Sequence, residues 1–99
     1  MFIISFTYIK SASEIDLLLT AHRQYLQTHF ASGVFLMSGR KVPRNGGIIL
    51  TDSIERADLE AIMQEDPYFI GAVASYEITE FVPSMTAELL SVFQPTKTN

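Results

Sequence analysis

The chain has 99 residues, of which 47% are hydrophobic and 18% are charged, and its formal net charge is −4. This length and composition predict one globular domain and exclude a disordered chain. The acidic balance argues against a general nucleic-acid-binding protein, and the absence of cysteine excludes disulfides, thiolate metal ligands and a cysteine nucleophile. No stretch approaches the roughly 20 apolar residues that span a bilayer, and the N-terminal apolar run lacks the features of a signal peptide, so we expect a cytoplasmic protein.

The segment from Phe2 to Ile9 is predicted to form a buried strand. It is β-branched and aromatic, too short for a helix, and interrupted by polar residues only at Ser5 and Thr7. Such a run is typical of a strand that is covered on both faces.

An amphipathic helix is predicted from Ser13 to Phe30, ending at about residue 31. The residues from Ser11 to Ser13 supply a helix start, and Glu14 lies in the first turn, where the helix dipole favours an acidic side chain. Gly33 is a plausible stop just beyond the end.

The apolar face of this helix contains a histidine. His22 lies in the middle of the face, so its imidazole should point inward and requires a hydrogen-bond partner. His29 shares the face but lies near the helix end, where its ring reaches water more easily. The face is formed by Ile15, Leu18, Leu19, Leu26 and Phe30.

A β-hairpin is predicted after the helix. The segments from Gly33 to Arg40 and from Gly47 to Thr51 are its strands. The segment from Lys41 to Gly46 is the turn, marked by Pro43 and by an Asn-Gly pair.

A second helix is predicted next, capped by Asp52 or Ser53, with a capping box between Asp52 and Glu55. Pro67 disfavours helical backbone at the residue before it, so we place a break at Glu65-Asp66 and Pro67 at the first position of a short extra turn. The apolar face of this second helix is Leu59, Ile62 and Met63.

The segment from Ala72 to Val82 is predicted to be a fourth strand. After it we expect two short helical turns that dock on the domain through Leu89, Leu90 and Phe93, and a frayed end over residues 95–99. The sequence thus divides into one domain over residues 1–82 and a C-terminal extension over residues 83–99.

The order of the predicted elements is β-α-β-β-α-β, the ferredoxin-like arrangement of an α+β protein. Right-handed crossovers place both helices on one face of a four-stranded antiparallel sheet and leave the other face open. The open face should carry large apolar residues of the first strand, either Phe2 and Ile4 or Ile3 and Ile9. Burial of such a patch favours a symmetric homodimer that associates sheet to sheet.

Asp66 is the candidate partner of His22. It follows the apolar face of the second helix at a spacing that keeps it toward the core. An aspartate beside an imidazole fixes its tautomer and stabilises the imidazolium, which suits a general base or acid. Two structural interpretations stay open: His22 as a hydrogen-bonded core histidine, and Asp66 as the N-cap of the Pro67 turn. One carboxylate oxygen can cap the turn while the other meets His22.

Several short motifs, taken in order from residue 1 to about 82, resemble the YciI-related family. Each motif is short, and their order and spacing carry the resemblance. The family has the dimeric α+β barrel form of the ferredoxin-like fold, which the resemblance therefore implies here. The motifs are Ala21-His22-Arg23-Gln24-Tyr25-Leu26, Gly33, Ser38-Gly39, Gly46-Gly47-Ile48-Ile49-Leu50 and Asp66-Pro67-Tyr68-Phe69-Ile70-Gly71.

The resemblance also implies a paired histidine and aspartate in a cleft, at positions that match His22 and Asp66. Relatives include an enzyme that removes chloride from a chlorinated hydroxyhydroquinone, in which a serine joins the pair. The matching residue here is Ser38. Where relatives often have proline after the Ser-Gly pair, this chain has Arg40, so we expect one pocket wall to differ.

The hairpin turn contains three of the seven basic residues, Arg40, Lys41 and Arg44. Either the turn is a solvated surface loop, or it forms a mouth that attracts a small anionic or aromatic ligand. Tyr68 and Phe69, like two further tyrosines, belong either to the core or to the wall of a pocket. In the functional interpretation, Arg40, Tyr68 and Phe69 bind substrate.

The leading hypothesis is a lyase or isomerase that needs no cofactor and acts on a small cyclic or aromatic molecule. His22 is the general base or acid, Asp66 orients it, and Ser38 donates a hydrogen bond to a substrate oxygen. The alternatives are a non-catalytic ligand-binding or assembly module and a cofactor-independent monooxygenase.

Other functional classes lack their sequence signals. There is no RNA-binding strand motif, no phosphate-binding loop and no dinucleotide fingerprint. His22 and His29 lie about 10 Å apart along one helix, which is too far to share a metal ion. We therefore expect no metal, nucleic-acid or membrane partner.

Overall fold

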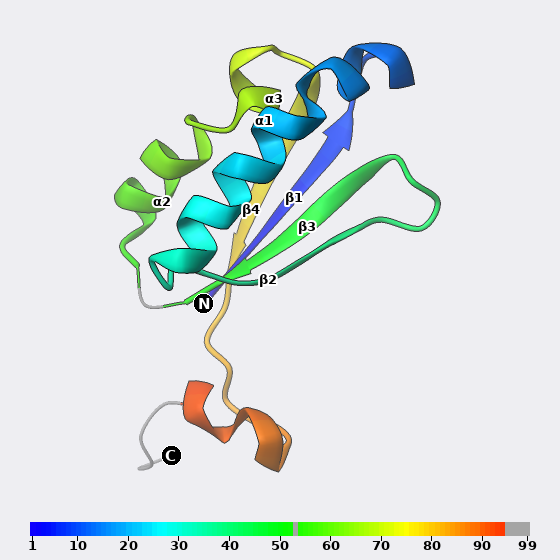
Figure 1. Cartoon of the computed structure of the whole chain (residues 1–99). Helices are drawn as coiled ribbons and strands as arrows, with labels where there is room; N and C mark the ends of the chain where they lie inside the picture. The colour runs from blue at the N-terminus through cyan, green and yellow to red at the C-terminus, as the bar shows by residue number, and fades with distance from the viewer. Residues whose placement is uncertain (53, 95–99) are drawn as a thin grey trace.

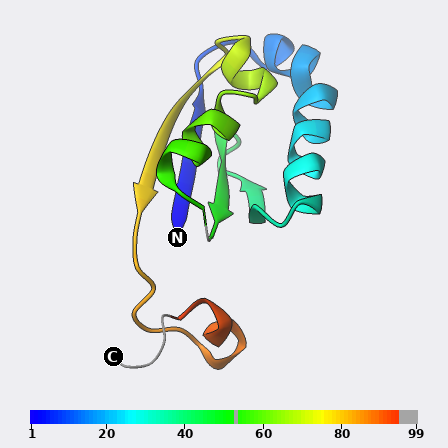
Figure 2. The same cartoon turned by 90° about the vertical axis from the view of Figure 1, so that its left-hand side faces the viewer.

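A computed structural model describes residues 1–52 and 54–94 (Figure 1). Its strands form one antiparallel sheet in the order β2-β3-β1-β4, and the helices of the domain cover one face of that sheet (Figure 2). The predicted α+β, ferredoxin-like arrangement is confirmed. None of the helices in the described residues is long and apolar enough to cross a membrane. The elements are β1 (Phe2–Tyr8), α1 (Ala12–Ala31), β2 (Phe35–Arg40), β3 (Gly46–Thr51), α2 (Arg56–Met63), α3 (Pro67–Ile70), β4 (Ala74–Glu80) and the 3-10 helix η1 (Glu88–Phe93).

Strand β1 divides its side chains between the core and the open face of the sheet. Phe2 and Ile4 are buried in the core with Phe6, whereas Ile3 is only half-buried. Because strand side chains alternate, the open face takes the predicted pair Ile3 and Ile9 and not Phe2 and Ile4. Ile9 lies beyond the strand end and is 57% exposed. The strand is therefore covered on one face in the single chain. Other apolar residues of the open face are Met37, Ile48 and Leu50.

Helix α1 begins and ends close to its predicted signals. The backbone N–H of Glu14 donates to Ser11 Oγ over 3.4 Å, and the backbone N–H of Ser11 donates to Glu14 Oε2 over 3.2 Å, which completes a capping box. Beyond the helix, Gly33 has φ +83°, a left-handed conformation that glycine adopts without steric cost. The helix buries Ile15, His22 and Tyr25, leaves Leu18, Leu19 and Leu26 half-buried, and leaves Phe30 exposed.

The predicted cap of α2 is wrong. The helix begins at Arg56, and its N-cap is Glu55, whose side chain makes no capping hydrogen bond. Asp52 therefore does not cap it, and Ser53 lies outside the described residues. The backbone is still extended at Glu55, and Ile54 packs partly against the core, so the chain uses this segment to pass from the sheet to the helix layer.

The C-terminal extension does not dock on the domain as predicted. Helix η1 lies beyond the end of the sheet (Figures 1 and 2), and Leu89 and Leu90 are 90% and 45% exposed. Phe81 and Met1 exchange backbone hydrogen bonds of 2.9 and 3.0 Å, which continue the direction of β4 and carry the following residues away from the core. The predicted docking through Leu89, Leu90 and Phe93 is therefore wrong, and residues 95–99 lie outside the described residues.

Two glycines allow β3 to lie close to β1. Gly47 pairs with Phe6 in the sheet register, and a Cβ atom at Gly47 would overlap the Phe6 ring. A Cβ atom at Gly46 would overlap the carbonyl oxygen of Phe6. Gly47 therefore gives the Phe6 ring its space, and Gly46 allows the close approach of the β1 backbone.

We expect Gly47→Ala to lower the free energy of unfolding by about 1–3 kcal/mol, because the added methyl group displaces the packed Phe6 ring. Urea denaturation followed by circular dichroism measures this change. Gly39→Ala is a matched control on the adjacent strand, since no atom lies within 4 Å of its Cβ position. Equal losses of stability in the two variants would contradict the role of the Gly47–Phe6 contact.

Candidate functional site

His22 is buried and hydrogen-bonded to Asp66. Its Nδ1 lies 2.7 Å from Asp66 Oδ1, and the two side chains are 7% and 1% exposed. A neutral imidazole that donates from Nδ1 keeps Nε2 as an acceptor. Tyr68 stacks on the imidazole at a centroid distance of 3.9 Å and an angle of 8°, and Phe6 meets it edge-on at 5.6 Å. These contacts hold the ring in one orientation.

The break between α2 and α3 positions Asp66. Pro67 occupies the first turn of α3, as predicted, and Asp66 is the N-cap, with extended backbone at φ −64° and ψ 125°. Because the helical direction changes here, the carboxylate turns into the core toward α1.

The Asp66 carboxylate accepts hydrogen bonds from three different elements. Oδ1 accepts from the backbone N–H of Tyr68 over 3.0 Å and lies against His22 Nδ1, so one oxygen both caps α3 and meets the histidine. Oδ2 accepts from the hydroxyl of Tyr76 over 2.6 Å. The cap and the histidine thus share Oδ1 instead of taking one oxygen each, because Tyr76 of β4 occupies Oδ2.

Burial raises the pKa values of three tyrosines around this pair. The pKa of Tyr68 rises to about 12, first through burial and then through the neighbouring Tyr8. Burial also raises the pKa of Tyr76, and so do its hydrogen bond to Asp66 and the charge of that carboxylate. The pKa of Tyr25 is raised by burial and by nearby carboxylates. All three hydroxyls therefore remain protonated at neutral pH.

A pocket of about 230 Å³ lies beside His22, between α1 and the β2–β3 hairpin. Asp66 holds Nδ1 of the histidine, so Nε2 is the nitrogen that is left for a ligand. Ser38 also lines the pocket. It pairs in register with the buried Ile49, which puts its side chain on the helix-covered face of the sheet.

The predicted site residues are not all at this pocket. His22, Ser38, Arg40 and Tyr68 line it, and Asp66 lies behind the histidine. Phe69 does not line it. Its ring is 38% exposed and packs edge-on against Tyr76 at 5.6 Å.

The site also contains residues that were not predicted, among them Tyr76 as a partner of Asp66, and Arg23 and Phe6 as pocket residues. Arg23 follows His22 directly, and its spacing from Leu19 indicates the pocket side of the helix. Tyr76 lies opposite Phe6 in the register of β1 and β4, which no local sequence pattern specifies.

His29 lies apart from this site. Its Nε2 is 3.1 Å from Glu65 Oε1, whose side chain is 59% exposed. Within residues 1–52 and 54–94, no group of three or more His, Cys, Asp or Glu side chains could hold a metal ion.

Comparisons with known proteins agree on the fold. The family model of the YCII-related domain matches residues 1–82. The structure is similar to 5-chloro-2-hydroxyhydroquinone dehydrochlorinase (TftG) from Burkholderia phenoliruptrix AC1100, in complex with 2,5-dihydroxybenzoquinone, with a TM-score of 0.65 and 12% identity over 82% of this chain and 93% of that chain. No curated protein matches the sequence.

We expect the free energy of unfolding to fall as the pH rises above about 10. Buried tyrosines hold their protons more tightly in the folded state than in the unfolded state, so this stability is fully present below the unfolded pKa and is lost as the pH rises toward the folded pKa, about 12 for Tyr68. Urea denaturation between about pH 8 and pH 12 measures the slope. Tyr76→Phe removes one of these groups and should flatten the slope, and an unchanged slope would argue against the raised pKa of Tyr76.

Proposed function

This chain belongs to the YCII-related family, and we propose that it is a lyase or isomerase acting on a small molecule, with His22 as its general base and acid. The observation that carries the proposal is the 2.7 Å contact between His22 Nδ1 and Asp66 Oδ1 in the wall of a pocket. A histidine that transfers protons needs one nitrogen anchored and the other accessible to substrate, and this arrangement meets both needs.

In the proposed reaction, Nε2 of His22 accepts a proton from a carbon or hydroxyl of the substrate. The electron pair of the broken bond forms a new double bond. In a lyase the leaving group then departs with its bonding pair, and in an isomerase the imidazolium returns the proton to another atom. Asp66 stabilises the imidazolium, and Ser38 donates a hydrogen bond to a substrate oxygen.

The pocket suits a substrate with a single ring. Its volume of about 230 Å³ is below the roughly 300–1,000 Å³ of common ligand sites. Phe6, Tyr8 and Tyr68 supply aromatic walls. The dehydrochlorinase of similar fold was captured with 2,5-dihydroxybenzoquinone, which also has one six-membered ring, and this supports a ring-shaped substrate here.

A second candidate function is a ligand-binding module without catalysis. The observation that favours it is the structural role of Asp66, which caps α3 and accepts hydrogen bonds from α1 and β4. A carboxylate with these contacts has a reason to be present even where no reaction occurs. Turnover and binding must therefore be measured separately.

We further propose that two copies of the chain associate through the open sheet face. That face contains Ile3, Ile48 and Leu50, and Met37 is 62% exposed beside them. Apolar groups gathered on one sheet face favour an isologous contact, in which the same patch is buried twice.

We expect His22→Asn to lower kcat/KM by about 10²- to 10⁴-fold on a substrate drawn from a panel of hydroxylated and halogenated six-membered rings. Absorbance and chloride release report the reaction. His29→Asn is the matched control, since it removes the other histidine of α1 and should leave kcat/KM unchanged. Wild-type rates in His22→Asn would refute the base, and binding of panel compounds by the wild type with conversion of none would favour the binding module.

We expect the wild-type protein to have twice the mass of one chain in size-exclusion chromatography with light scattering. Met37→Lys combined with Leu50→Lys should yield monomers, because two charges then oppose each other across the interface. Leu17→Lys is the control, because Leu17 is 84% exposed on α1 and away from the sheet. A monomeric wild type, or a dimer that survives the double change, would disprove association through this face.

A further inference from the structure

The pocket beside His22 carries the opposite sign of charge to the protein as a whole. The chain has 11 acidic and 7 basic residues, yet three of the basic ones, Arg23, Arg40 and Arg44, line this single pocket. Among the described residues, no aspartate or glutamate lines it. A concave site lined by one sign of charge focuses the electrostatic potential and attracts ligands of the opposite sign.

From this positive charge in an acidic protein we infer that the substrate is a small organic carboxylate. Its carboxylate group binds Arg23 and Arg40 while its apolar body lies in the pocket. The inference deepens the proposed function and rests on it, since it concerns the same pocket. It adds a substrate class and a second binding arginine.

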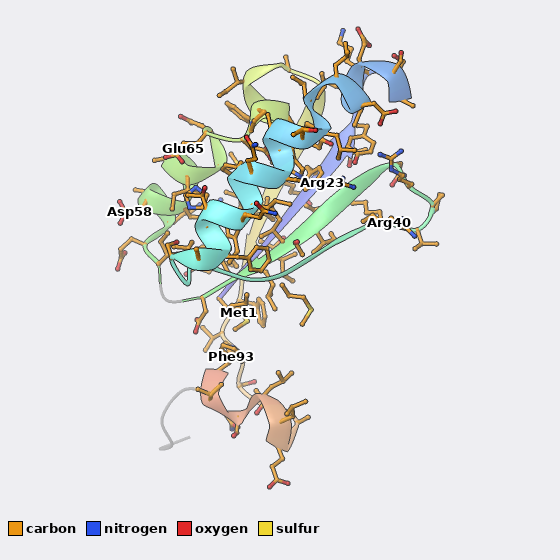
Figure 3. All side chains as sticks on the ribbon, in the orientation of Figure 1. Met1, Arg23, Arg40, Asp58, Glu65 and Phe93 are labelled. Carbon is orange, nitrogen blue, oxygen red and sulfur yellow. The ribbon has the colours of Figure 1, made fainter. Side chains whose placement is uncertain are left out.

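Helix geometry explains the position of Arg23. Leu19, Arg23 and Leu26 are separated by four and three residues, so they share one face of α1, and all three line the pocket. Figure 3 shows Arg23 on α1 and Arg40 on the hairpin, so the two guanidinium groups come from opposite walls.

Both of these arginines are available to a ligand. Among the described residues, neither Arg23 nor Arg40 forms an ion pair. Arg44 is different, because its Nη2 lies 3.6 Å from Asp16 Oδ1. Those two side chains are 47% and 58% exposed, and exposed pairs of this kind are weak, so Arg44 adds positive charge without being the main anchor.

The chemistry of the arginines favours a carboxylate. A guanidinium group is planar and donates two parallel hydrogen bonds, which match the two oxygens of a carboxylate. The rest of the wall includes Phe6, Leu19 and Ile49, which can contact an apolar ring but offer no side-chain hydrogen bond. A ring that carries one carboxylate satisfies both parts of the wall.

We expect benzoate to bind at least about tenfold more tightly than benzamide, which has the same shape without the charge. Titrations followed by ¹H–¹⁵N NMR give both dissociation constants. Arg23→Gln and Arg40→Gln should each weaken benzoate binding by about tenfold and leave benzamide binding unchanged.

Arg56→Gln is the matched control for these variants. Arg56 pairs with Glu60 on α2 over 3.2 Å, outside the pocket, so its removal makes the net charge more negative by the same amount but should not change benzoate binding. A similar loss in Arg56→Gln would show that benzoate responds only to overall charge and would overturn the inference. So would equal affinities for benzoate and benzamide, or no saturable binding of benzoate.

His22→Asn separates this inference from the proposed function. If the arginines hold the carboxylate, this variant keeps most of its benzoate affinity even though it has lost the proposed base. Arginine-dependent benzoate binding together with wild-type turnover in His22→Asn would refute the proposed base alone. Binding that is lost in His22→Asn but insensitive to both arginines would refute the carboxylate site alone.

Discussion

The buried carboxylate of Asp66 is the group on which the rest of this structure depends. It is 1% exposed, and a carboxylate in such a place is costly unless hydrogen-bond donors surround it. Here the donors come from α1, α3 and β4, so one side chain ties the distant helix α1 to the consecutive elements α3 and β4. The same contacts orient His22 toward the pocket. The stability of the helix layer and the geometry of the candidate site therefore have a common physical origin.

The shape of the pocket depends on the two glycines of the hairpin as well as on its larger side chains. Gly46 lets the β1 backbone approach, and Gly47 leaves room for the Phe6 ring, which in turn packs edge-on against His22. The charge of the pocket is equally local. At physiological salt the Debye length is about 8 Å, so the acidic residues on distant surfaces are screened at the pocket, whereas three arginines line it. A protein with net charge −4 can thus present a cationic site.

Hydrophobic periodicity and helix signals were sufficient to predict the order of the elements, because each is a local property of the chain. Asp66 could be predicted as well, since Pro67 marks a helix start and the residue before it is the cap. Tyr76 could not, because its partnership with Asp66 depends on the register of β1 and β4. The predicted cap of α2 was wrong for a related reason. Asp52 and Glu55 have the spacing of a capping box, but this segment carries the chain from the sheet to the helix layer. The predicted docking of the C-terminal extension was wrong because apolar residues such as Leu89 indicate burial but do not specify the surface that would cover them.

The two roles of Asp66 determine which residue can reveal the chemistry. A change at Asp66 alters the cap of α3, the link to β4 and the orientation of His22 together, so a loss of activity there would not distinguish chemistry from structure. His22 is more informative, because its Nε2 takes part in none of these structural contacts. Tyr76 lies between the two cases. It contacts Asp66 but does not line the pocket, so it is a positioning residue whose effect on a reaction must pass through the carboxylate. Comparing Tyr76 with His22 therefore measures how much of the proposed activity depends on holding the carboxylate and how much on the imidazole itself.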